Sequence, residues 1–386
     1  MDCAFCWKFH PDNRHALATG VVIPQRDEPL NRLPIPCIQA RVSHDWTWPR
    51  REKTAMTSIR WLAAVAAFCL LALGMSAAAA SEMTARPTAS SVDIDHFWEA
   101  YDAAVKVDDP ARQLLIMQQQ YIDRGTPGLH AFMQAKGYTA QSYVDAIRDY
   151  PHYWVSIRSH TLRAPAAIAA LEPQLRKFQA LYPAMRPASI YFAIGALKSG
   201  GTTQGNKVLI GAELATGDDT VDISEMTPKT QAWLRTYFHS RPFDHMELLV
   251  VHEFVHTQEH GQAKDLLGQS LYEGIADFVA EQVTGHLPPL DYVTYGPGHD
   301  AVIRDAFVRD MDKEDTGGWL YASTGAPFGV RDLGYYVGYA ICQAYYRQSA
   351  DKRLAIKQMI ELNFDDKKAV RAFVDSSGYL GKAASR

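Results

Sequence analysis

The segment at residues 243–261 constrains the fold most, because ionisable side chains interrupt an otherwise apolar helical pattern. Leucine, valine and phenylalanine fill most of it, so we expect a buried helix. His252 and His256 are four residues apart and share one helix face, with Glu253 beside them. Burying such groups costs free energy unless they are paired or bind a ligand. The fold must therefore bring partners to this helix.

The spacing His-Glu-x-x-His is typical of a zinc centre, in which both histidines bind the ion and the glutamate deprotonates its water. A third protein ligand is needed, and Glu273 follows in a second helical segment. Asp277 is four residues after Glu273, on the same face, where it would accept the free N–H of a ligand histidine. The sequence predicts a Zn²⁺ centre of His252, His256 and Glu273, with Asp277 behind the ligands and Glu253 as general base.

His260 is the alternative third ligand, eight residues after His252. On one continuous helix the two residues are about 12 Å apart along the axis, too far for one ion. Metzincin peptidases break the helix with a glycine three residues after the second histidine, where this chain has Glu259. We therefore expect His260 at the surface or at the edge of the cleft.

The motif with its downstream glutamate resembles the gluzincin metallopeptidases. Residues 250–258, 271–278 and 332–339 further resemble a bacterial family of predicted zinc-dependent proteases that includes a gliding-motility lipoprotein. This resemblance implies a gluzincin-like core with an active-site helix and a helical C-terminal part. It also implies hydrolysis of peptide bonds. The chain lacks the lipoprotein cysteine of the gliding branch, which argues against a motility role.

Related zinc peptidases stabilise the oxyanion with a tyrosine or histidine from a later helix. Tyr335, in the tyrosine-rich helix expected over residues 332–348, is the first candidate for this catalytic role. Tyr336, Tyr339 and His299 are the alternatives, and core packing is the other interpretation of the tyrosines.

The remaining patterns predict an α+β chain, mostly helical, with a small sheet. Capping signals and apolar periodicity indicate helices from residue 92 to 182. Short β-type runs at 189–194 and 207–210 are joined by a glycine-rich segment that we interpret as a mobile loop. The run at 207–210 is either an edge strand that pairs with an extended substrate or an ordinary sheet strand. Gly334 and Gly338 would let the last long helix approach a neighbour closely.

The N-terminal part predicts export. In residues 56–80, a basic flank, a 13-residue apolar run and a small-residue site are typical of a signal peptide. The run spans about 20 Å as a helix, short of the roughly 30 Å bilayer core, so no stable membrane span is expected. We interpret residues 1–55 as an upstream translated extension, 81–185 as a helical N-terminal region with a flexible leader to residue 91, and 186–386 as the zinc-metallopeptidase-like domain.

The net charge of the chain bears on which molecules it can bind. The net charge of −4 provides no basic field for nucleic acid, and we expect a peptide or protein substrate in the periplasm or outside the cell. Cys342 lies in an apolar helical stretch and is expected in the core.

The sequence leaves three alternative functions open. They are a non-catalytic envelope binding or assembly protein with a structural or remnant metal site, a zinc-free helical protein, and an amidase acting on cell-wall peptides. Glu253, which is no ligand, favours an enzyme over a structural site.

Overall fold

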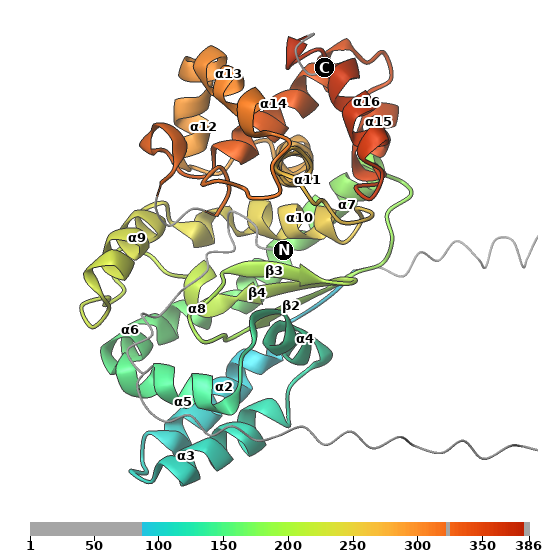
Figure 1. Ribbon diagram of the computed structural model, residues 1–386. Helices are drawn as coiled ribbons and strands as arrows, with labels where there is room; N and C mark the ends of the chain where they lie inside the picture. Colours follow the sequence, from blue (N-terminus) through green and yellow to red (C-terminus); the bar gives the residue numbers. More distant parts are fainter. Residues whose placement is uncertain (1–86, 322–324, 382–386) are drawn as a thin grey trace, which may run out of the picture. The chain divides into compact units, whose positions relative to one another are not determined.

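The computed structural model describes residues 87–321 and 325–381 (Figure 1). The expected extension at 1–55 and the expected signal peptide at 56–80 lie outside these residues. Among the helices that the structure describes, none has the length and apolar character needed to cross a membrane.

A four-stranded mixed sheet lies at the centre of the described chain, in the order β1-β2-β4-β3. Strand β1 (Thr88–Ser90) pairs in parallel with β2 (Ser189–Ala193), and β2 pairs in parallel with β4 (Lys207–Gly211). Strand β3 (Gly201–Gln204) runs antiparallel to β4. The predicted α+β, mostly helical chain with a small sheet is thereby confirmed.

Three details of the sheet correct the sequence interpretation. The segment interpreted as a mobile loop contains β3, and the expected flexible leader contains β1. The run at 207–210 is no edge strand, because β4 is paired on both sides and β3 forms the edge. The glycines around the two threonines of β3 weakened the strand signal, since glycine is depleted in strands.

Side-chain caps begin several of the helices in the region where the sequence predicts helices. The side chains of Asp109 and Thr126 accept hydrogen bonds from the first backbone N–H groups of their helices, and Gly137 ends the second of these in a left-handed conformation. The helices before the central strands are α2 (Val92–Ala104), α3 (Pro110–Ile116), the π-helix η1 (Met117–Ile122), α4 (Pro127–Lys136), α5 (Ala140–Asp149), α6 (Pro151–Thr161) and α7 (Ala164–Leu181).

Pro151 is the first residue of α6 and follows the end of α5. Proline suits the first helical turn, where its missing N–H has no partner in any case.

The elements after β4 are α8 (Ala212–Ala215), α9 (Pro228–His239), η2 (Pro242–His245), α10 (Met246–His256), α11 (Leu266–Thr284), α12 (Asp291–Tyr295), η3 (Gly296–His299), α13 (Asp300–Asp310), η4 (Pro327–Gly329), α14 (Leu333–Gln348), α15 (Lys352–Ile360) and α16 (Lys367–Ser377).

The sheet separates two helical layers (Figure 1). Helix α4 contacts strands β2, β3 and β4 on one face, and α10 contacts β3 and β4 on the other. Side chains alternate between the faces of a strand, so Gly201 and its partner Ile210 share the face toward α10. The sheet thus forms a floor beneath α10, the helix that carries the histidines.

Helix α11 packs most extensively against α14, and glycines make this approach close. A Cβ atom on Gly338 would lie 1.8 Å from the carbonyl oxygen of Ser270, and one on Gly274 would lie 2.1 Å from the carbonyl carbon of Gly338. The predicted role of Gly338 is confirmed. Cys342, further along α14, is fully buried as expected.

A buried carboxylate on α8 fixes the chain that leaves β2. Glu213 accepts hydrogen bonds from the backbone N–H groups of Gly195 at 2.9 Å and Leu197 at 3.2 Å. Burial raises the pKa of Glu213 to about 7. Leu197 has a φ of 61°, a strained left-handed conformation for leucine, which the hydrogen bond from its N–H to Glu213 helps to hold.

Candidate metal centre

The helix that carries the histidines is shorter than expected. The sequence predicted one helix over 243–261, but η2 precedes α10 and α10 ends at His256. His252 and Glu253 are at most 1% exposed and His256 is 9% exposed. The apolar residues of α10 bury the helix on all sides, as the pattern indicated.

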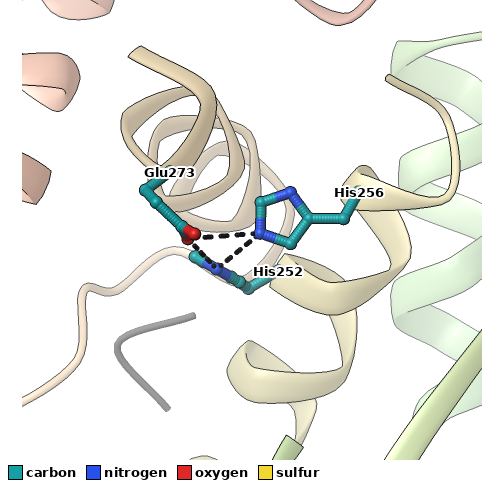
Figure 2. A group of neighbouring side chains, drawn as sticks. All are labelled: His252, His256 and Glu273. Carbon is teal, nitrogen blue, oxygen red and sulfur yellow. Dashed lines mark hydrogen bonds and ion pairs between the residues drawn. The ribbon is translucent and has the colours of Figure 1, made fainter. Parts of the chain in front are cut away.

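Three side chains from two helices converge at one point (Figure 2). His252 and His256 come from α10, and the fully buried Glu273 comes from α11, which packs against α10. The two Nε2 atoms are 3.1 Å apart. Oε2 of Glu273 lies 3.3 Å from each of them. The structure therefore brings together the three residues that the sequence proposed as ligands.

Asp277 lies where the sequence predicted it. Its Oδ1 is 2.8 Å from Nδ1 of His252, and its Oδ2 accepts a hydrogen bond from the hydroxyl of Tyr292 at 2.7 Å. When Nδ1 of His252 donates to this carboxylate, the lone pair of Nε2 points to the convergence point. Asp277 thus fixes both the ring orientation and the tautomer.

Glu259 holds His256 in the same way, and sequence reasoning missed this role. Its Oε2 is 2.6 Å from Nδ1 of His256, and its side chain is buried. In the sequence, Glu259 only excludes the metzincin pattern. The available signal was its position three residues after His256, within reach of the same side chain once the helix ends.

The electrostatics of the group favour positive charge. Burial opposes the charged form of His252, but hydrogen bonds to Asp277 and Glu273 outweigh it and raise its pKa to about 9. Burial likewise opposes charge on His256, yet Glu259 and Glu273 keep its pKa well above the usual value. Burial would raise the pKa of Glu273, but the two histidines bring it down to about 2. The carboxylates of Glu259, Glu273 and Asp277 thus stabilise positive charge at the two imidazoles. That charge is carried either by protons on the rings or by a metal cation bound in their place.

The three atoms fit a zinc ion. A tetrahedral ion with bonds of about 2.0–2.1 Å needs ligand atoms about 3.3 Å apart, close to the three edges in the structure. Two imidazole nitrogens and one carboxylate oxygen form a donor set that zinc accepts. Protons could hold the same atoms together through hydrogen bonds, and ligand histidines must lose those protons when a metal binds.

Glu253 lies beside the edge strand of the sheet. A Cβ atom on Gly201 of β3 would be 3.2 Å from its Oε1, so a side chain there would require the glutamate to shift by a few tenths of an ångström. Strand β3, rather than the strand at 207–210, is therefore the strand that borders the predicted general base.

Tyr335 packs beside the centre. It is fully buried, and its ring stacks against that of His252 with 6.4 Å between centroids. The alternatives contact other residues: the hydroxyls of Tyr336 and Tyr339 donate to Asp300 and Glu281. His299 is exposed and stacks on Tyr295. A catalytic role for Tyr335 stays a prediction.

Two more tyrosines contact the ligands and were missed. The ring of Tyr272 stacks on His256, with 4.1 Å between centroids. The hydroxyl of Tyr321 donates to Oε1 of Glu273 at 2.6 Å. Tyr272 directly precedes Glu273 in the segment 271–278. Tyr321 comes from a loop far along the chain, and no local pattern links it to Glu273.

His260 is exposed, as the sequence indicated, because the chain leaves the helix after His256. Its ring accepts a hydrogen bond from the guanidinium of Arg186 at 3.1 Å.

The chain was compared with family models, with curated proteins and with solved structures. It matches none of them.

Proposed function

We propose that the chain is an exported zinc-dependent peptidase with a gluzincin-like core, in which His252, His256 and Glu273 bind the ion. The observation that carries the proposal is the near-equilateral triangle of three buried ligand atoms, with Glu253 on the same helix turn. The signal-peptide pattern at residues 56–80 supports export to the periplasm or the outside of the cell.

A bound zinc ion would act as a Lewis acid and make water more acidic. Glu253 would hold a water molecule beside the ligands, take its proton and pass it to the leaving amine. Asp277 and Glu259 would keep both imidazoles in the tautomer that presents Nε2.

The substrate class that we propose is an extended peptide. Strand β3 forms the edge of the sheet, and its Gly201 lies against Glu253. An extended peptide that adds to a sheet edge gains main-chain hydrogen bonds. Addition to β3 would bring a peptide bond close to Glu253.

The test is peptide hydrolysis by the purified chain, with Glu253→Gln and the matched control Glu247→Gln. Glu247 is on the same helix, and its Oε1 lies 3.6 Å from Nε2 of His286. We expect Glu253→Gln to keep the metal and to lose about 10²–10⁴-fold in kcat, since that is the usual contribution of a general base. Glu247→Gln should retain activity. Equal activity in all three proteins would contradict the proposal.

A non-catalytic metal site is the second candidate, and burial favours it. The three ligands and Glu253 are at most 9% exposed, as in a site that only joins two helices. A structural site needs no carboxylate at Glu253 and usually has four protein ligands. Metal binding with no hydrolysis of a broad peptide library would support this second candidate.

A further inference from the structure

The two carboxylate oxygens of Glu273 have different partners. Oε2 points to the histidines, at 3.3 Å from both Nε2 atoms. Oε1 accepts the hydroxyl of Tyr321 at 2.6 Å. A carboxylate can bind a metal through one oxygen or through both. Which mode Glu273 adopts therefore depends on what holds Oε1.

Tyr321 is held in place by its own backbone. Its φ is 59°, which is uncommon for a residue with a side chain. Its N–H donates to Oδ1 of Asp332 at 2.7 Å, and Asp332 is buried. Two residues earlier, the carbonyl of Trp319 accepts the N–H of Gly334 at 2.9 Å, and Trp319 is 1% exposed. The phenol is thus fixed from α14 and from the core.

The other tyrosines at the centre contact different groups. Tyr272 and Tyr335 stack on the two histidines, and Tyr292 donates to Asp277. All three are buried, whereas Tyr321 is half-buried. Tyr321 therefore combines a hydrogen bond to a ligand carboxylate with a position at the boundary of the core.

We propose that Tyr321 is a positioning residue that restricts Glu273 to one metal-binding oxygen. The proposal rests on the metal centre proposed above. The hydroxyl donates its hydrogen to Oε1, which keeps this oxygen engaged while Oε2 remains with the histidines. With three ligand atoms instead of four, the ion keeps one coordination position for water, as catalytic zinc sites require. If both oxygens of Glu273 bound the ion, the same water would become a fifth ligand.

The experiment uses Co²⁺ as a spectroscopic probe, because its visible absorption depends on coordination number. The purified full chain is compared with Tyr321→Phe and with the control Tyr345→Phe, whose hydroxyl donates to Gln358 on the surface. Tyr321→Phe should shift the Co²⁺ spectrum from four-coordinate to five-coordinate character and weaken Co²⁺ binding about 10-fold. The spectrum and affinity of Tyr345→Phe should equal those of the wild type.

A second variant protects the test against misfolding. Asp332→Ala keeps the phenol and removes its backbone anchor, so it should change the spectrum in the same direction. Circular dichroism establishes that each variant is folded. Wild-type spectrum and affinity in a folded Tyr321→Phe would overturn the proposal.

The outcomes separate this inference from the proposals on which it rests. No Co²⁺ or Zn²⁺ binding by the wild type would overturn the metal centre and the role of Tyr321 together. Metal binding without peptide hydrolysis would contradict the peptidase alone, and the Co²⁺ spectra would still decide the role of Tyr321.

Discussion

Replacing Gly338 by alanine tests whether helix packing holds the ligand Glu273 in place. The new Cβ atom would lie 1.8 Å from the carbonyl oxygen of Ser270 and 3.0 Å from Cα of Gly274. Carbon and oxygen atoms normally approach no closer than about 3.3 Å, so α14 and α11 must separate by about 1.5 Å. Such overpacking lowers the free energy of unfolding by up to about 3 kcal/mol. The better helix propensity of alanine offsets about 1 kcal/mol of this loss. The net loss of stability is about 2 kcal/mol.

The same displacement reaches the metal centre, because Gly274 is the neighbour of Glu273 in α11. Ligand distances tolerate only about 0.2 Å, so we expect zinc affinity to fall about 10- to 100-fold. Thermal unfolding in chelator should show a decrease in Tm of roughly 4–8 °C. A zinc titration against a competing dye gives the affinity.

The matched control is Gly298→Ala, since Gly298 is exposed and a Cβ atom there meets no neighbour within 4 Å. Its stability should change by less than about 0.5 kcal/mol, with unchanged zinc affinity. Wild-type Tm and zinc affinity in Gly338→Ala would refute the reasoning that this contact sets the position of Glu273.

Two further predictions concern buried carboxylates. Asp277→Asn and Glu259→Gln should each weaken zinc binding about 10- to 100-fold in a competition titration. Each variant removes the negative charge that holds a ligand imidazole in place. Unchanged zinc affinity would show that these contacts do not position the ligands. Burial raises the pKa of Glu213 from 4.5 to about 7, so the folded chain retains a proton that the unfolded chain releases between these values. The stability from this group is present below pH 4.5 and is lost as the pH rises through 7, by about 3 kcal/mol at most. Urea unfolding from pH 4.5 to 8 should show this decrease, and Glu213→Gln should flatten it; an unchanged slope would contradict the assignment.

The candidate ligands could be predicted from sequence because local rules place them. Helical periodicity puts His252 and His256 on one face, and the same rule aligns Glu273 with Asp277. The distance between α10 and α11 was not predictable, since it depends on tertiary packing. The spacing of Gly334 and Gly338 predicted a close approach of α14 to a neighbour, but not that the neighbour would be α11 at Gly274.

The errors also have physical reasons. Of the two interpretations of 207–210, the edge strand was wrong and the ordinary sheet strand is confirmed, because β3 pairs beyond it. The helix expected to residue 261 ends at His256, and this end lets Glu259 fold back to His256. Tyr321 reaches Glu273 from 48 residues away in the chain. Contacts of such sequence separation arise from the whole fold and leave no local pattern.

The most direct measurement is the zinc content of the purified chain, compared with His256→Ala and the control His260→Ala. His256 provides one of the three converging atoms, whereas His260 is exposed and contacts Arg186. We predict one zinc per chain in the wild type and in His260→Ala, and none in a folded His256→Ala. A folded wild type that binds no zinc after saturation and dialysis, or a His256→Ala variant that retains it, would contradict the account.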